Sequence, residues 1–213
     1  MASIQTYPQS VPTLKIEKEG RLLTLAEFEK TTGAKFLPQL EFGHFSLVAE
    51  LSKQCAKLHK KGGLTRQQVW FGKYYQKELL AQGAPPLSIR WVDESIGWGV
   101  FIEKDLRKMD FICEYTGVVR RRKRTDKTNS YCFEYLISQG EESPYVIDAA
   151  QQGGVSRYIN HSSRPNLLSV LCTFDNITHI VLVANEDIPK GTQLSYDYGP
   201  NYWLYRPKPL PLI

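Results

Sequence analysis

The sequence lacks the features that mark secreted, membrane and metal-cluster proteins. Its four cysteines lie far apart and form no CxxC pair, so neither a disulfide framework nor a zinc cluster is expected. No run of about 18 apolar residues is present, and the N-terminus shows no basic-then-apolar signal peptide. We therefore expect a soluble protein of a reducing compartment, with no metal site and no membrane partner.

The chain also lacks an extreme charge, although it has enough apolar residues to build a core. Of its 213 residues, 42% are hydrophobic and 12% are aromatic, which is typical of a folded protein. This length suits one compact domain with a substantial addition, or two small domains. The net charge of +5 favours acidic partners only mildly, and an ordinary solvated surface explains it equally well.

The N-terminal residues 1–85 predict a helical segment. Thr24–Glu27 has the pattern of a capping box, and Gly33 is expected to end the helix that it begins. Ser46 is expected to cap a second helix that ends at Lys60. The apolar stripe of this second helix would consist of Leu47, Leu51, Cys55 and Leu58.

A third helix is expected between Thr65, its cap, and Gly83. Its apolar stripe would carry Trp70, Tyr74 and Leu79. The three helices are expected to form a brace for the rest of the chain, or else a partner-binding or homodimer surface. A brace is favoured because apolar stripes usually pack within their own chain.

After Pro85–Pro86 the pattern changes to short β-rich runs separated by turn formers. Asp175–Asn176 predicts a hairpin between two of these runs. No βαβ alternation appears, so a doubly wound nucleotide-binding sheet is not expected. The predicted fold class is α+β. The runs are 87–92, 100–102, 111–115, 131–137, 145–147, 168–174, 180–184 and 194–196.

Four short motifs follow one another in this β-rich part. Gly97–Gly99, which reads GWG, enters a strand, and Glu114–Gly117, which reads EYTG, ends one. Arg157–Asn166 reads RYINHSSRPN, and Leu194–Tyr198 reads LSYDY. Each motif alone is unspecific, since a tight turn or a strand end can look the same. Their order along the chain is specific.

In this order, the motifs resemble those of the SET-domain protein lysine methyltransferases. The resemblance implies a β-rich SET fold of several short strands in residues 86–200, with a pseudoknot-like C-terminal crossing and an insert at about 118–147. The aromatic and proline-rich tail, residues 201–213, would close the substrate channel. The implied reaction is methyl transfer from S-adenosylmethionine to a lysine amine of a protein substrate.

The resemblance also assigns site residues. Tyr198 matches the catalytic tyrosine of the family, and Tyr196 and Tyr131 are expected beside it. A tyrosine at position 196 implies mono- or dimethylation over trimethylation. His161 is expected to bind and support rather than to act as a general base. The residues expected to bind the cofactor are Gly97, Trp98, Gly99, Tyr131, Arg157, Asn160, His161, Tyr198 and Trp203.

The chain departs from many members of the family at Ser163, where they carry a zinc-binding cysteine, and its tail has no cysteine. No metal site is therefore carried over. The short format, zinc-free tail and helical N-terminus are similar to the small stand-alone bacterial methyltransferases of chlamydia type, which act on histones or histone-like basic proteins. The expected compartment is the cytoplasm of a bacterium, with delivery to a host nucleus as an extension, and otherwise the nucleus.

A second function class remains open, namely a catalytically weak SET scaffold or a chromatin or nucleic-acid binding module that uses Arg120–Arg124. The ordinary interpretation of this basic run is a solvated loop, and phosphate contact or a nuclear-import signal is the sharper alternative. The intact Tyr196, Tyr198 and Asn160-His161 pair favour the enzyme. For a basic substrate, a local acidic groove is expected from Glu134, Glu141 and Glu142.

Overall fold

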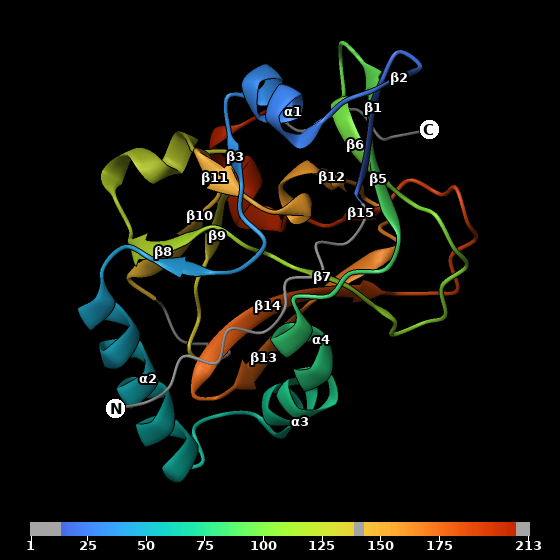
Figure 1. The fold of residues 1–213 in the computed structure, drawn as a ribbon. Helices are drawn as coiled ribbons and strands as arrows, with labels where there is room; N and C mark the ends of the chain where they lie inside the picture. The colour runs from blue at the N-terminus through green and yellow to red at the C-terminus, as the bar shows by residue number, and fades with distance from the viewer. Residues whose placement is uncertain (1–13, 139–142, 208–213) are drawn as a thin grey trace.

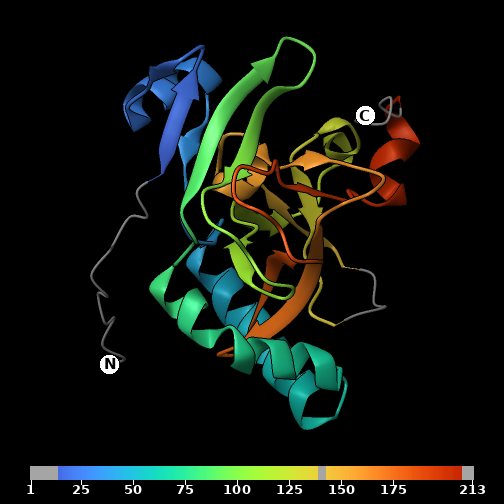
Figure 2. The same ribbon diagram turned by 90° about the vertical axis from the view of Figure 1, so that its right-hand side faces the viewer.

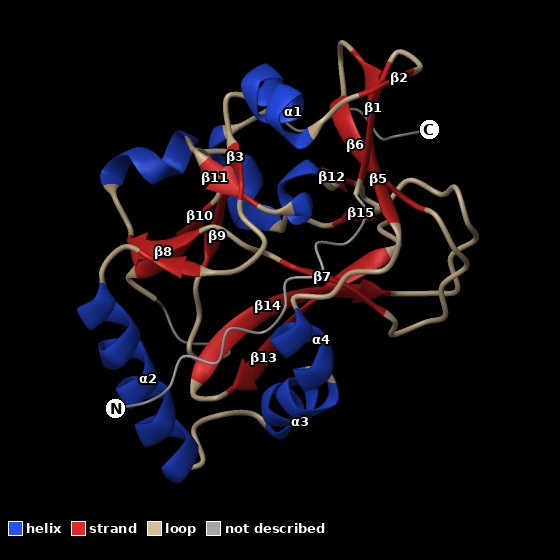
Figure 3. Ribbon diagram, in the orientation of Figure 1, coloured by secondary structure: helices blue, strands red, loops and turns tan. Residues whose placement is uncertain are grey.

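The computed structural model describes residues 14–138 and 143–207. Three sheets of three or four strands pack around a main hydrophobic core with a second, smaller cluster beside it, and two further strand pairs join them (Figures 1 and 3). The first sheet has the order β2 (Arg21–Leu22), β1 (Lys15–Lys18), β5 (Leu87–Asp93) and β6 (Gly97–Ile102). The second has the order β4 (Glu41–Phe42), β8 (Val118–Arg121), β10 (Tyr145–Asp148) and β9 (Cys132–Glu134).

The third sheet has the order β13 (Leu167–Phe174), β14 (Ile177–Ala184) and β7 (Phe111–Glu114). The two strand pairs are β3 (Lys35–Phe36) with β11 (Gln152–Gly153), and β12 (Asn160–His161) with β15 (Ser195–Tyr196). Single turns of 3-10 helix follow at η1 (Arg124–Thr128), η2 (Val155–Tyr158) and η3 (Pro200–Tyr205). The predicted β-rich part with helices in the N-terminal third is confirmed.

The first two helices follow the sequence pattern, with one change. Helix α1 (Leu25–Thr32) begins at the predicted capping box and ends at Gly33 in the left-handed conformation. Helix α2 (Phe45–Lys60) buries Leu47, Leu51 and Cys55 as expected, although its cap is His44 and not Ser46. The ring atom Nδ1 of His44 accepts a hydrogen bond from the backbone N–H of Leu47 at 3.1 Å. The prediction for Ser46 is wrong because the histidine provides the acceptor two residues earlier.

The expected third helix is two helices, α3 (Arg66–Tyr74) and α4 (Gln76–Ala81). Thr65 caps α3 as predicted, but the predicted stripe is wrong at Trp70 and Tyr74, which are 53% and 55% exposed. Its third member, Leu79, does pack against the buried cluster. The buried face carries Gln68, Phe71, Gly72 and Tyr75 instead. A Cβ atom at Gly72 would lie 1.8 Å from the carbonyl oxygen of Thr173, so the helix lies directly on β13 through this glycine.

The N-terminal third is part of the same core as the β-rich part. Strands β1, β3 and β4 pair in parallel with β5, β11 and β8. These strands of two to four residues were not predicted, because they are too short to show an alternating pattern. Figure 1 shows α3 and α4 beside β13 and β14, with α1 on the opposite side near β1. The packing supports the brace, and the homodimer surface stays a prediction.

In the β-rich part, each predicted run contains a strand. The hairpin at Asp175–Asn176 is confirmed, with φ angles of 49° and 59° that suit a tight type I′ turn. The basic run is not a solvated loop throughout, because Arg120 and Arg121 belong to β8. No helix among the described residues is long and apolar enough to cross a membrane.

Candidate functional site

The third and fourth motifs lie side by side, although they are far apart in the sequence. Strands β12 and β15 pair in parallel, with Asn160 opposite Ser195 and His161 opposite Tyr196. Asn166 locks the two segments together: its Nδ2 donates to the carbonyl of Gln193 at 2.8 Å, and its Oδ1 accepts from the backbone N–H of Ser195 at 2.9 Å. This is the C-terminal crossing that the resemblance implied.

Tyr198 lies at the centre of this cluster. Its hydroxyl donates to the carbonyl oxygen of Ile159 at 2.9 Å, and its backbone N–H donates to Nδ1 of His161 at 3.2 Å. Its ring is flanked by the rings of Tyr196 and Tyr202, with centroids 4.8 and 4.7 Å away. Since His161 uses Nδ1 as an acceptor for the backbone, its ring positions Tyr198, as expected of a supporting residue.

Burial changes the acid–base behaviour of these phenols. Burial, and then the neighbouring Tyr202 and Tyr131, raise the pKa of Tyr198 above its usual range. Burial raises the pKa of Tyr196 and of Tyr115 in the same direction. Low-dielectric surroundings disfavour the phenolate. These tyrosines therefore stay neutral at physiological pH and act as hydrogen-bonding dipoles, not as bases.

The GWG turn contacts the same cluster. Nδ2 of Asn160 donates to the carbonyl oxygen of Trp98 at 3.0 Å, which links the first motif to the third. The Trp98 ring meets Phe28 of α1 edge to face at 4.8 Å. Gly97 has a φ of 75°, and a Cβ at Gly99 would lie 2.7 Å from Nε2 of Gln193. The left-handed backbone therefore favours glycine at position 97, whereas a side chain at position 99 would require the flexible end of Gln193 to shift.

Arg157 and Tyr131 form the edge of the cluster. The guanidinium of Arg157 lies 3.8 Å from the centroid of the Tyr131 ring, which is a cation–π contact. Its Nε and Nη2 donate to the carbonyls of Ala149 and Ala150 at 2.7 and 3.2 Å. The backbone carbonyl of Tyr131 accepts from the hydroxyl of Tyr115 at 3.1 Å. These bonds hold an aromatic face and a positive charge together.

Trp203 comes from the tail, on η3. Its ring lies 4.8 Å from the His161 ring and is nearly parallel to Tyr198, with centroids 6.3 Å apart. The predicted site residues therefore gather in one region, from β6, β12, β15, η2 and η3. That they bind a cofactor or perform catalysis stays a prediction.

A groove of about 710 Å³ opens beside this cluster. Tyr115, Phe133, Tyr196 and Tyr198 line its aromatic part. Two 3-10 turns, η1 and η3, line it as well, and Figure 2 shows them side by side near the C-terminal end of the ribbon. Trp98, Asn160 and His161 are not among the described residues that line the groove. The tyrosines therefore have the groove on one side and the Asn160-His161 segment on the other.

Two expectations about charge need correction. Arg120 donates to Asp126 and to Asp148, with Nη2–oxygen distances of 2.7 and 2.6 Å, so it is part of a partly buried ion-pair network. Glu134, expected in an acidic groove, is paired with Arg122 at 2.8 Å. Glu141 and Glu142 lie outside the described residues. The groove is therefore not acidic where the structure describes it.

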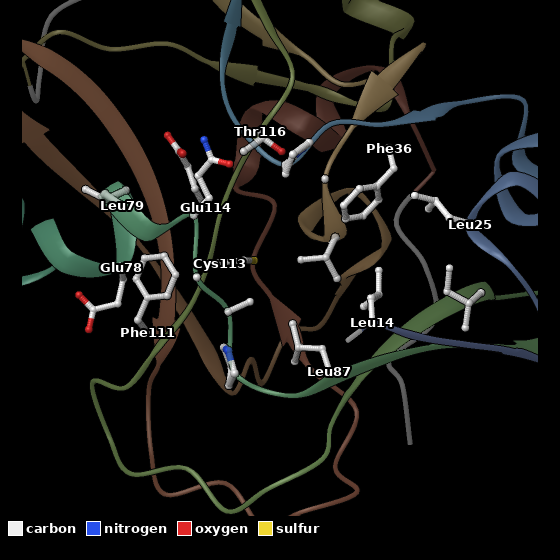
Figure 4. A pocket seen from close by; sticks show the side chains of 18 residues that line it. Leu14, Leu25, Phe36, Glu78, Leu79, Leu87, Phe111, Cys113, Glu114 and Thr116 are labelled. Carbon is white, nitrogen blue, oxygen red and sulfur yellow. The ribbon is translucent and has the colours of Figure 1, made fainter. Parts of the chain in front are cut away.

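A second, smaller cavity of about 140 Å³ lies between the N-terminal elements and the sheets. Figure 4 shows the apolar side chains around it, including Leu14, Phe36, Leu79, Leu87 and Phe111. None of the predicted site residues is among the described residues that line it. In the described ranges, the four cysteines are free thiols, and no cluster of His, Cys, Asp or Glu could hold a metal ion.

Three supporting residues were not predicted from the sequence. Phe28 packs between Trp98 and Tyr158, at 4.8 and 4.9 Å, and so supports two motifs from α1. Tyr115 was visible in the EYTG motif, but only the fold shows its hydroxyl on Tyr131. Gln193 precedes the LSYDY motif and gave no signal of its own, since its contact is with the distant Gly99.

The SET domain family matches residues 97–199. The H3 lysine-9 specific histone-lysine N-methyltransferase SUVH5 of Arabidopsis thaliana is 40% identical over 50% of this chain, and the match covers 14% of that protein. The histone-lysine N-methyltransferase Su(var)3-9 of Drosophila melanogaster is 34% identical over 53% of this chain and 20% of its own. The chain thus spans a fifth or less of these two curated relatives.

Among solved structures, polycomb repressive complex 2 of Chaetomium thermophilum contains a similar fold. The TM-score is 0.51 at 27% sequence identity, and the match covers 61% of this chain and 17% of that chain. The similarity to the small bacterial type stays a prediction.

Proposed function

Because the chain carries a SET domain over residues 97–199, we propose that it is a protein-lysine N-methyltransferase that uses S-adenosylmethionine. The observation that carries this proposal is the position of Tyr198, held by Ile159 and His161 between the groove and the Asn160-His161 segment. The relatives from Arabidopsis and Drosophila, both named histone-lysine N-methyltransferases, support the same reaction.

The residues present fit this cofactor by their chemistry. Arg157 provides a guanidinium for a carboxylate, and its Nη1 has no bond among the described residues. The Oδ1 atom of Asn160 likewise remains available as an acceptor. Tyr131 and Trp203 provide aromatic faces, which suit both an adenine ring and a sulfonium cation. When bound, S-adenosylmethionine supplies an electrophilic methyl group on a positively charged sulfur.

The groove provides what the lysine requires. Free lysine has a pKa of about 10.4, yet only the neutral amine can attack a methyl carbon. The aromatic surroundings of Tyr115, Phe133 and Tyr196 remove water from the amine and so lower its pKa. Tyr198, kept neutral by burial, presents a phenolic oxygen and not a charge. The chain thus orients and desolvates the amine, and the lysine proton leaves to water through the groove.

The number of methyl groups and the acceptor are parts of the same proposal. Tyr196 is buried and lines the groove. We expect its hydroxyl to leave little room for a methylated amine to turn, which would favour mono- or dimethylation. A histone or histone-like protein is the acceptor that the relatives suggest, and a nuclear compartment follows only for a histone of a eukaryotic cell. The charge of the groove also influences which residues can flank the acceptor lysine.

The test is to incubate the protein with S-adenosylmethionine and candidate acceptors, and to identify the product by mass spectrometry. Mono- or dimethyl-lysine is expected, and efficient trimethylation would contradict the role given to Tyr196. Calorimetric titration with S-adenosylmethionine tests whether the protein binds the cofactor, which identifies a scaffold that binds it without transferring the methyl group. Saturable cofactor binding without methyl transfer to any acceptor would identify a scaffold and overturn the proposal.

A further inference from the structure

The groove beside Tyr196 and Tyr198 is positively charged in the part of the chain that the structure describes. Five cationic side chains and two carboxylates line it. The cations are Arg122, Lys123, Arg124, Lys127 and Arg206, and the carboxylates are Asp126 and Glu134. A lysine-rich segment placed here would meet like charges, which oppose association.

Both carboxylates already accept hydrogen bonds from arginines of the protein itself. Asp126 accepts from Nη1 and Nη2 of Arg120 at 2.9 and 2.7 Å, and its side chain is only 7% exposed. Glu134 accepts from Arg122 at 2.8 Å. An arginine or lysine of a substrate would have to replace these bonds. The carboxylates therefore do not offer an acidic surface to a basic tail.

The remaining cations have no carboxylate partner in the described ranges. Lys123, Arg124 and Lys127 are exposed on and beside η1 and form no ion pair there. Nζ of Lys127 lies 5.2 Å from the centroid of the Tyr205 ring. This contact keeps one charge of η1 next to η3, at the entrance of the groove.

Arg206 is the most telling of these residues. Its Cζ lies 4.3 Å from the Tyr202 ring, while Nη1 donates to the Tyr202 carbonyl at 2.8 Å and Nε to Oγ of Ser130 at 3.3 Å. Its Nη2 is buried and has no acceptor among the described residues. Buried donors are normally satisfied, and a guanidinium is best satisfied by a carboxylate. The arginine is thus held in place with one donor unused.

We propose that the acceptor lysine of this protein is flanked by aspartate or glutamate residues, which bind Arg206 and the cations of η1. This specificity rests on the proposed function, because it concerns the peptide on either side of the methylated lysine. The amine reaches the tyrosines through the aromatic part of the groove, and the acidic flanks lie along η1 and η3.

Nucleic acid is the other polyanion that such charges could bind, but a peptide fits the structure better. Arg120, the first residue of the basic run, is partly buried and is already paired with Asp126 and Asp148, so phosphates would have to compete with these carboxylates. The free cations border a groove that leads to Tyr196 and Tyr198. That location suits a chain carrying a reacting side chain.

The experiment compares two lysine peptides of equal length, one with glutamates and one with arginines around the same central lysine. At low salt, kcat/KM should be at least about 10-fold higher for the acidic peptide, and the ratio should fall as salt screens the charges. The triple variant Lys123→Glu, Arg124→Glu, Lys127→Glu should reverse the preference. The control Lys60→Glu, Lys61→Glu, Lys73→Glu makes the same charge change at exposed positions at the end of α2, directly after it and in α3, and should leave the ratio unchanged.

The same two peptides, labelled with a fluorophore, are also tested for binding by fluorescence polarisation. This measurement distinguishes a failure of this inference from a failure of the proposed function. Equal methylation of both peptides, or a preference for the basic one, overturns the inference and leaves the methyltransferase standing. Acidic-peptide binding that needs the η1 cations, without any methylation, supports the groove specificity and overturns the enzyme. Tighter binding of an oligonucleotide than of the acidic peptide, lost in the groove variant, replaces the peptide with nucleic acid.

Discussion

The two sides of the protein core use tyrosine in different ways. On the covered side, where α3 and α4 lie on the sheets, the hydroxyl of Tyr75 donates to the Met109 carbonyl at 2.8 Å. On the groove side, the hydroxyl of Tyr198 donates to the Ile159 carbonyl at 2.9 Å. Burial raises the pKa of both phenols. The hydrogen bond and the pKa therefore do not distinguish a structural tyrosine from a functional one.

The two tyrosines differ in the open space near them. The covered side has a cavity of about 140 Å³ with mainly apolar side chains around it, whereas the groove has about 710 Å³ and a border that includes unpaired cations among the described residues. A small, mainly apolar cavity offers few groups for recognition. An open, charged groove that ends at neutral phenols can admit a side chain and select its neighbours. Location relative to the groove, and not residue type, identifies the site.

The largest expected effect concerns the covered side. The Gly72→Ala variant would place a Cβ atom 1.8 Å from the Thr173 carbonyl oxygen, so α3 must move off β13. We expect the free energy of unfolding to fall by about 3 kcal/mol or more, measured by urea denaturation. The control is Gly83→Ala, where a Cβ would meet its nearest neighbours at 3.9 Å. Equal stabilities of the two variants would mean that α3 is not held against β13.

A smaller effect is expected at the wall of the groove. The Asp126→Asn variant weakens two charged hydrogen bonds from Arg120, at a cost of about 2 kcal/mol at neutral pH. The hydrogen bond from Arg120 lowers the pKa of Asp126 below its ordinary 3.8. The stability that Asp126 contributes is thus present above about pH 4 and lost as pH falls through the lowered value.

Unfolding of wild type and Asp126→Asn at neutral pH and near pH 3 checks this sign. The difference between the two proteins should shrink in acid. Asp175→Asn, at the exposed hairpin turn, is the control and should change stability by less than about 0.5 kcal/mol. A difference that grows in acid would show that the Arg120 network does not hold Asp126 ionised.

The smallest effect concerns the pH–rate profile, in which ionisation of Tyr198 should cause no loss of rate. Below the pKa of the acceptor lysine, single-turnover methyl transfer should rise about tenfold per pH unit as the amine loses its proton. Because burial raises the pKa of Tyr198, no fall from phenol ionisation is expected below about pH 10. A descending limb near pH 9 that disappears in Tyr198→Phe would contradict the neutral phenol.

Local patterns in the sequence predicted much of this molecule because the causes are local. The capping box at Thr24, the left-handed stop at Gly33 and the type I′ turn at Asp175–Asn176 depend on neighbouring residues alone. The four motifs predicted a cluster around Tyr198 for another reason. Their order along the chain was specific, and the fold then brought them together.

The features that could not be predicted depend on contacts between distant residues. Helix α3 buries the face that carries Phe71 because Gly72 on that face lies against the backbone of Thr173. Residues near Gly72 in the sequence give no indication of this contact. In the sequence, nothing near the basic run indicated a partner for its charges, yet Arg120 forms ion pairs with Asp126 and Asp148. Glu134 looked available for a basic substrate until its pairing with Arg122 was visible.

The most direct test of the account is a matched pair of hydroxyl deletions, Tyr198→Phe and Tyr75→Phe, assayed for methyl transfer and thermal stability. Each removes one phenolic donor to a backbone carbonyl, so each should lose about 1 kcal/mol of stability. Tyr198→Phe should lose methyl transfer by at least about 100-fold, while Tyr75→Phe keeps the wild-type rate. Equal rates in the two variants would contradict the claim that the groove, and not the covered side, carries the chemistry.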